Sequence, residues 1–142
     1  MSIAAILEGK GEEVSSVDAA ISVRDAVAIL AEKRIGALPV TRDGSVAGII
    51  SERDVIYCLS LEGAAVLDRQ VAEVMTARVT VIAGAVNVLA ALSQMTKRRI
   101  RHLPVVEEGR LIGIVSIGDL VAYRIARIER EAEEMRSYIQ SA

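Results

Sequence analysis

Aromatic residues are nearly absent from this chain of 142 residues, which contains no Trp, no Phe and three Tyr. Hydrophobic residues still make up 52% of it, so the core must be built from Val, Ile, Leu, Ala and Met. This composition excludes disorder, which needs low hydrophobicity and high net charge. The length suits one compact domain or two very small ones.

Cysteine and histidine are equally scarce, with one of each at Cys58 and His102. A lone cysteine cannot form an internal disulfide, and we interpret Cys58 as a small buried hydrophobe. The sequence shows no metal-ligand cluster, no P-loop and no Ser/His/Asp or Cys/His set. We therefore expect neither a metal site nor an enzyme.

The charge and the apolar stretches argue against two classes of partner. A net charge of −2 provides no electrostatic basis for binding nucleic acid or an anionic membrane. The longest apolar stretch, residues 79–92, is interrupted by Thr80, Gly84 and Asn87, and a membrane span requires roughly 18 apolar residues. The first residues also lack the cationic start and apolar run of a signal peptide. We expect a soluble, cytoplasmic protein.

An internal repeat organises the chain. A shift of 65 residues places residues 14–57 on residues 79–122 without a gap. Within it, "IGALPVTRDGSVAGIISERDVI" lies on "IRHLPVVEEGRLIGIVSIGDLV", and nine of these 22 positions are identical. The leader "IAAIL" recurs as "VAEVM", but at an offset of 68, because "EGKG" adds three residues to the first copy. A repeat this regular indicates one supersecondary unit used twice.

Each unit is predicted to run strand, helix, strand, strand, helix. Short first strands are expected near residues 14–17 and 79–82. The helix begins at Ser22 or Asn87, both good N-cap residues, and has apolar residues at i, i+3, i+4 and i+7. A Leu-Pro-Val strand follows, and Asp-Gly or Glu-Gly then predicts a tight hairpin turn.

The two units are expected to pack on each other, because about 55 residues are only marginally stable alone. The predicted fold is α/β (α+β), with two tandem β-α-β-β-α repeats related by pseudo-two-fold symmetry and a long C-terminal helix. The predicted divisions are 1–62 for the first repeat with its leader helix, 63–124 for the second and 125–142 for the helical extension. Residues 58–70 are expected to form the crossover.

This repeat resembles the CBS domain, and the pair resembles a stand-alone Bateman module. The likeness lies in "IGALPV…DG…GIISERD" and "IRHLPV…EG…GIVSIGD". The resemblance implies a disc of two repeats that binds adenosine-containing ligands between them. It also implies a protein that dimerises and regulates another protein rather than catalysing a reaction.

The repeated Ser-x-x-Asp motif allows two interpretations. Ser51 with Asp54, and Ser116 with Asp119, fit a capping box at a helix start. The acids recur, however, while the residues between them change from Glu-Arg to Ile-Gly, and ligand clefts in α/β folds open at such strand ends. A carboxylate also suits the 2′,3′-diol of a ribose. Together with the resemblance, this predicts that Asp54 and Asp119 bind ribose.

Further ligand contacts are predicted around the same joins. Ser51 and Ser116 begin helices whose free N–H groups can donate to hydroxyl or phosphate oxygens. Without aromatic rings, adenine must be held by backbone and aliphatic groups. We assign this contact to Val14, Ser16, Val17, Ala37, Val79, Val81 and Ile82. The expected regulatory ligand is AMP, ADP, ATP, NAD or S-adenosylmethionine, with no prosthetic group.

Cationic residues are distributed unequally between the copies. Arg101 and His102 precede the second Leu-Pro-Val, where the resemblance implies phosphate contact, and the first copy has Gly36 and Ala37 instead. Arg53 can add charge on the side of the first repeat. A lone His is otherwise usually a structural residue. We predict two unequal sites, at least one of which holds phosphates.

The C-terminal residues 120–140 are predicted to continue as a long helix. Apolar residues spaced 4, 3, 4, 3, 4 form a seam of about two and a half heptads, which favours pairing with a second subunit. The seam consists of Val121, Ile125, Ile128, Ala132, Met135 and Ile139. The alternative is a helix that packs back on its own domain.

Two functions fit these observations. The leading one is a homodimeric sensor that binds an adenine nucleotide between its repeats and signals to an unidentified regulated protein. The alternative is a ligand-free CBS module that serves only in oligomerisation or protein interaction.

Overall fold

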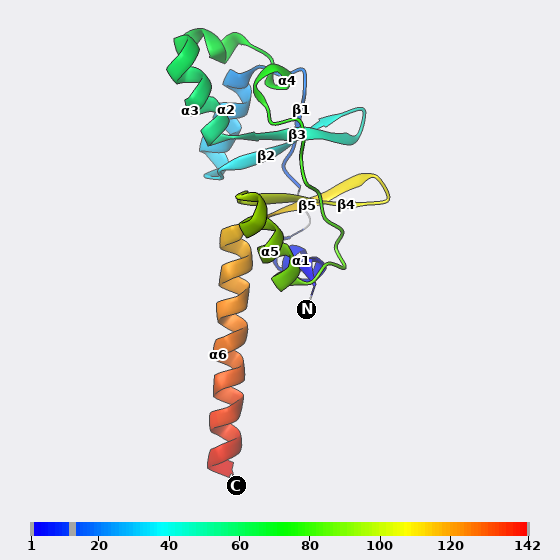
Figure 1. Ribbon diagram of the computed structural model, residues 1–142, viewed down its shortest axis with the longest axis vertical. Coiled ribbons are helices and arrows are strands. Elements are labelled where there is room, and N and C mark those ends of the chain that lie inside the picture. Colours follow the sequence, from blue (N-terminus) through cyan, green and yellow to red (C-terminus); the bar gives the residue numbers. More distant parts are fainter. Residues whose placement is uncertain (1, 12–13, 142) are drawn as a thin grey trace.

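Two stacked halves and one projecting helix make up the molecule (Figure 1). The computed structural model describes residues 2–11 and 14–141, so the predicted outer boundaries at residues 1 and 142 lie outside the described residues. Each half contains a β-hairpin with helices packed on it. The first half follows the predicted strand, helix, strand, strand, helix order, and the second half follows it except that a single bridge at Ile82 stands in place of the first strand. The mixed α and β fold with a long C-terminal helix is confirmed.

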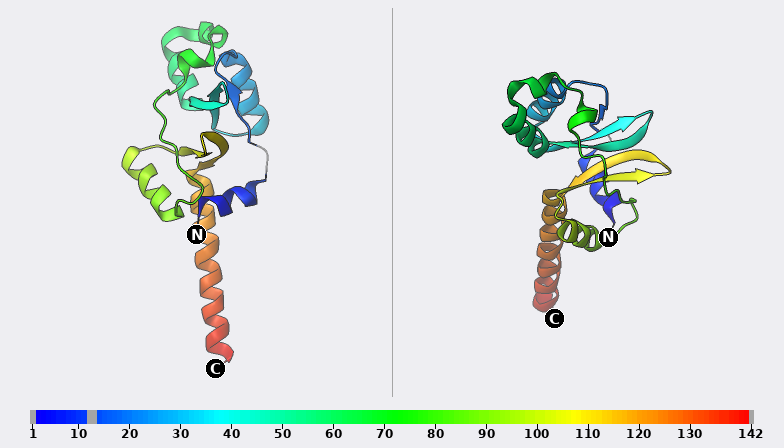
Figure 2. Two further views of the ribbon diagram at one scale, coloured as in Figure 1. Left: turned by 90° about the vertical axis from the view of Figure 1, so that its right-hand side faces the viewer. Right: turned by 45° about the horizontal axis from the view of Figure 1, so that its top comes forward.

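The two hairpins lie side by side at the centre (Figure 2). In the first, β2 (Ala37–Arg42) pairs with β3 (Ser45–Ser51). In the second, β4 (His102–Glu107) pairs with β5 (Arg110–Ser116). Both are antiparallel, and the register shifts at the same point in each. The repeat in the sequence is therefore also a repeat in the structure.

The hairpin turns have the backbone conformation that Asp-Gly and Glu-Gly predict. Asp43 and Gly44 have φ values of 53° and 82°, and Glu108 and Gly109 have φ values of 50° and 78°. Two successive residues with positive φ are typical of a type I′ turn, whose twist matches that of the adjoining strands. The tight turn is confirmed in both copies.

The first helix of each repeat begins at its predicted cap. Helix α2 (Val23–Lys33) follows Ser22, whose Oγ accepts a backbone N–H of the first turn at 3.1 Å. Helix α5 (Val88–Arg98) follows Asn87, whose Oδ1 accepts a backbone N–H at 2.7 Å. These local bonds satisfy N–H groups that a helix start leaves unpaired.

The first strand of each repeat is shorter than predicted. Strand β1 is only Val17–Asp18, parallel to β2. In the second repeat, Ile82 makes a single parallel bridge to Val105. The predicted strands 14–17 and 79–82 are thus correct only at their last residue. The residues before these points line cavities instead of extending a sheet.

Each half has its own hydrophobic core, and the leader helices are exchanged between the cores. Helix α1 (Ile3–Lys10) buries Ile3 and Ile6 in the core of the second repeat. Helix α4 (Val71–Val74) belongs to the core of the first repeat. Residues 1–62 therefore do not pack as one unit with their leader. Each leader covers the sheet of the other repeat, which the similarity of the leaders could not reveal.

Two glycines allow the leader segments to approach the sheets closely. A Cβ atom on Gly48 would lie 2.5 Å from the carbonyl oxygen of Thr76 and 2.8 Å from the sulfur of Met75. A Cβ atom on Gly113 would lie 2.6 Å from Cδ2 of Leu7. The glycine at this point of both repeats is explained by the leader that crosses the strand there.

Gly48→Ala is expected to lower the free energy of unfolding by about 1–3 kcal/mol through overpacking. The added methyl group would meet a backbone oxygen of Thr76, which Ile49 holds through backbone hydrogen bonds of 3.0 and 2.9 Å. Gly113→Ala is the matched control and should cost less, because the Leu7 side chain can rotate away. Denaturant unfolding measures both losses. Equal losses would contradict the assigned role of the backbone contact.

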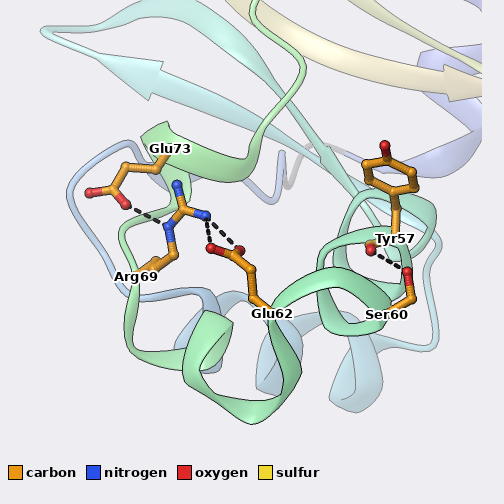
Figure 3. A network of polar contacts seen from close by, with 5 residues as sticks. All are labelled: Tyr57, Ser60, Glu62, Arg69 and Glu73. Carbon is orange, nitrogen blue, oxygen red and sulfur yellow. Dashed lines mark hydrogen bonds and ion pairs between the residues drawn. The ribbon is translucent and has the colours of Figure 1, made fainter.

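The crossover between the repeats begins later than predicted. Helix α3 extends over Glu52–Glu62, and a 3-10 helix, η1 (Gly63–Asp68), follows it. The part of the predicted crossover before residue 63 is therefore helical. Arg69 then donates to both carboxylate oxygens of Glu62 at 2.8 and 2.6 Å and to Glu73 at 2.8 Å (Figure 3). This network links α3 to the segment that leads into α4.

Helix α6 (Ile117–Ser141) projects away from both halves (Figures 1 and 2). The seam side chains are open to solvent, from 43% exposed at Val121 to 65% at Ile139. The alternative in which this helix packs back on its own domain is wrong. Across residues 2–11 and 14–141, no helix has both the length and the apolar character to cross a membrane.

Candidate functional site

A cavity of about 250 Å³, here called the first groove, lies between the two repeats. Its walls come from the join of β3 and α3 in the first repeat and from the segment before β4 in the second. The predicted ligand residues that line it are Ser51, Arg53, Asp54, Val79, Arg101 and His102. The structure thus brings together residues that lie about 50 positions apart in the sequence.

The carboxylate of Asp54 caps helix α3 and also faces the first groove. Its Oδ2 accepts from the backbone N–H of Ser51 at 2.9 Å and from the Ser51 hydroxyl at 3.0 Å. Ser51 Oγ accepts in return from the Asp54 N–H at 3.2 Å, which completes a capping box. Oδ1 accepts from the Thr76 hydroxyl at 3.2 Å. Capping uses only Oδ2. Oδ1 can therefore release the neutral Thr76 hydroxyl and accept a hydroxyl group of a ligand instead.

Four arginines line the same cavity as this carboxylate, together with one further acid, Glu52. The arginines that line the first groove are Arg53, Arg78, Arg99 and Arg101. Sequence reasoning did not predict Arg78, Arg99 or Thr76 as site residues. Arg78 could have been identified from the sequence, because it directly precedes Val79, a residue predicted to contact the ligand. Several guanidinium groups around one cavity favour an anionic ligand.

His102 is half-buried where the repeats meet. A Cβ atom built on Gly36 of the first repeat would lie 3.7 Å from its Cε1. Burial lowers the pKa of His102 below its ordinary value of 6.5, and the carboxylates of Asp119 and Glu52 offset only part of this effect. At neutral pH the imidazole is therefore mainly neutral, with one nitrogen that donates and one that accepts.

Acidification from about pH 7.5 to about pH 5.5 is expected to lower the melting temperature through His102. Because burial holds the folded pKa below 6.5, the unfolded chain takes up the proton more readily, so stability falls once the pH drops below that value. His102→Gln should lose less stability than the wild type over this interval. Thermal unfolding at a series of pH values measures the difference. Parallel curves for the two proteins would contradict this prediction.

The equivalent region of the other repeat, here called the second groove, consists of Asp119 and an adjoining cavity of about 140 Å³, smaller than the first. Lys10, Val14, Ala37 and Ile114, among others, line this cavity, whereas Asp119 does not and is reached from it through Lys10. Asp119 Oδ2 accepts from the Ser116 N–H at 2.8 Å and from Lys10 Nζ at 2.7 Å. Burial would raise the pKa of Asp119, but the Lys10 and Ser116 bonds outweigh it, so the pKa lies below 3.8. Sequence reasoning missed Lys10.

The residues predicted to contact adenine are divided among several places. Val79 lines the first groove, and Val14 and Ala37 line the second. Ser16 lies with Val14 in a different depression, beside the hairpin turns. Val17 and Ile82 are each only 5% exposed, within the two cores, and Val81 is 44% exposed. Val17 and Ile82 therefore offer a ligand almost no surface, and the backbone N–H and carbonyl groups of Ile82 already bond to Pro104 and Val106.

The fold and these paired grooves define a tandem regulatory module. Residues 12–61 and residues 71–126 each match the family model of the CBS domain. The chain belongs to the CBS domain family and contains two copies of the domain.

Relatives of known sequence or structure share this arrangement. The chain is 35% identical over 124 residues to the CBS domain-containing protein CBSX3, mitochondrial, of Arabidopsis thaliana, which covers 84% of this chain and 60% of that protein. It therefore spans less than two thirds of that relative's length. The CBS-domain containing protein ATU1752 from Agrobacterium tumefaciens is 38% identical, with a TM-score of 0.82 over 87% of this chain and 99% of that one.

A third relative carries ligands. The CBS domain pair of protein MJ0100 is 25% identical, with a TM-score of 0.79 over 89% of this chain and 98% of that one. Its structure was solved in complex with 5′-methylthioadenosine and S-adenosyl-L-methionine. Some members of this structural class therefore bind adenosine-containing ligands.

Proposed function

We propose that this CBS pair is a sensor that binds an adenosine-containing nucleotide in the first groove. The observation that carries the proposal is the composition of that groove, where Asp54 lies in one cavity with Arg53 and Arg101 from opposite repeats. A ribose diol and a phosphate group need this combination of acceptor and cations. The adenosine ligands of MJ0100 support the choice of ligand class.

Each part of the ligand has a defined counterpart in the first groove. Asp54 Oδ1 would accept from a ribose hydroxyl in place of Thr76. The start of α3 and the guanidinium groups of Arg53 and Arg101 would hold phosphate, and His102 would donate one further hydrogen bond. Arg78 is added to this set because it lines the same cavity. Adenine would lie against Val79 and be distinguished by backbone groups.

Binding is proposed to produce a signal rather than a reaction. A ligand held by residues of both repeats shifts the balance between two relative tilts, provided that it binds one of them more tightly. The exposed seam of α6 would pair two chains into a homodimer, so that the change in tilt reaches an unidentified regulated protein. We propose no catalytic step.

The second candidate is a ligand-free interaction module. The observation in its favour is that the carboxylates of Asp54 and Asp119 are both engaged in capping boxes. In that case the Ser-x-x-Asp motif needs no ligand to explain it. The exposed seam would remain the functional surface.

A thermal-unfolding panel distinguishes these functions. AMP, ADP, ATP, NAD and S-adenosylmethionine are each added at millimolar concentration, with GMP as the control for the base and 2′-deoxy-AMP as the control for the ribose diol. A ligand at 100 times its dissociation constant adds about 2.7 kcal/mol to the stability of the folded state. We expect at least one adenosine ligand to raise the melting temperature. No shift with any of the five would favour the interaction module.

A further inference from the structure

We propose that Lys10 closes the second groove, so that the wild-type chain binds one nucleotide rather than two. Lys10 Nζ lies 2.7 Å from Asp119 Oδ2 and 3.0 Å from the backbone oxygen of Ile114. The ammonium group thus holds a charged donor against the carboxylate that a ribose hydroxyl would have to approach. The identity of the excluded ligand rests on the proposed function, but the closure itself does not.

The carboxylate of Asp119 is already paired with a cation. Its Oδ2 accepts from the Ser116 N–H at 2.8 Å and from the Lys10 ammonium group at 2.7 Å. The Asp119 side chain is 27% exposed, and the Lys10 side chain is 40% exposed. A ribose that approached Asp119 would meet a charged donor, and to bond to Oδ2 it would have to displace the Lys10 ammonium group at 2.7 Å. At the first groove it would displace only the neutral Thr76 hydroxyl at 3.2 Å from Asp54.

The two grooves differ because the sequence repeat is interrupted after the first leader. The extra residues of "EGKG" follow the first leader and have no counterpart in the second. Helix α1 therefore runs for eight residues and ends at Lys10, whereas α4 runs for only four. Because α1 packs on the second repeat, its additional turn carries Lys10 to Asp119. The insertion supplies the group that makes the two grooves unequal.

Removal of Lys10 should open the second groove without unfolding the protein. Its ion pair is partly exposed, and such pairs contribute little to stability. An opened groove would still lack the cations of the first one, since Gly36 and Ala37 stand where the second repeat has Arg101 and His102. We therefore expect the new site to take AMP more weakly than the first.

Isothermal titration calorimetry with AMP tests this stoichiometry. The wild type should bind one equivalent per chain, and Lys10→Met should add a second, weaker equivalent. Lys33→Met, at the exposed end of α2, is the matched control and should remain at one. Two equivalents in the wild type, or one in Lys10→Met, would overturn the proposal. Lys10→Gln provides a second neutral variant in case the first expresses poorly.

A measurement without nucleotide separates this proposal from the proposed function. The chain has three lysines, Lys10, Lys33 and Lys97, so their acetylation rates can be followed individually by mass spectrometry. The ion pair should make Lys10 the slowest to react in the wild type, and Asp119→Asn should accelerate Lys10 alone. Equal rates at Lys10 and Lys33 in the wild type would refute the closure. Absence of AMP binding combined with a slow Lys10 would refute only the nucleotide function.

Discussion

Asp54→Ala is expected to weaken AMP binding to the first groove by about 10- to 100-fold, because losing a hydrogen bond to a charged group costs about 1.5–3 kcal/mol. The groove keeps its shape and its arginines. The substitution should therefore weaken the contact with the ribose and leave the contact with the phosphate in place. Calorimetry with AMP and with 2′-deoxy-AMP measures this. Removing the 2′-hydroxyl should weaken binding to the wild type and should have little further effect on Asp54→Ala.

Asp119→Ala is the matched control for this prediction. Both substitutions remove the acid of a capping box, which costs about 1 kcal/mol of stability in each case. Only Asp54→Ala should abolish the discrimination between AMP and 2′-deoxy-AMP, because Asp54 lines the first groove and Asp119 does not. The cost to the unliganded protein is measured separately by denaturant unfolding. Full AMP affinity in Asp54→Ala would show that this carboxylate serves only as a cap.

Removal of the chain after Tyr123 is expected to convert a dimer into a monomer, which would more than halve the mass measured by light scattering after chromatography. The truncated chain retains the two cores but loses most of the seam, including Ile125 at 50% exposed and Met135 at 60% exposed. Apolar side chains at heptad spacing on a projecting helix gain stability by pairing with a second copy. The fold itself should survive, with the same helix content per residue in the remaining part.

Point variants distinguish the seam from helix length. Ile125→Glu with Ile128→Glu places charge on the seam and should dissociate the dimer in the full chain. Arg130→Gln with Glu134→Gln changes an equal number of residues away from the seam and should leave the dimer intact. An unchanged dimer after truncation would exclude the seam from self-association. Exposed apolar residues on α3, including Ile56 at 64%, would then be the next surface to examine.

The two grooves show how a duplicated unit can acquire different sites. Each groove keeps its acid in the same capping geometry, but the first gathers arginines and the second receives a lysine from the leader. The negative charge of Asp119 raises the pKa of His102 and so opposes part of the lowering that burial causes.

The sequence by itself determined the features that depend on neighbouring residues. The repeat predicted two equivalent hairpin units, and Asp-Gly predicted the turn that the φ values of Asp43 and Gly44 confirm. Ser22 and Asn87 marked the helix starts because a cap bonds to a backbone only two or three residues away. The spacing of Ser51 and Asp54 likewise predicted the capping box as one of two interpretations.

Only the tertiary structure decided which distant groups meet. The exchange of leader helices, the approach of Lys10 to Asp119 across 109 positions and the entry of Arg78 into the first groove leave no periodic pattern in the chain. The sequence also left open whether α6 projects from the molecule, because the apolar face of a helix can pack on its own domain or on a second subunit. Local hydrogen bonds and hydrophobic periods can be read from adjacent residues, whereas the partner of an exposed side chain depends on the packing of the whole fold.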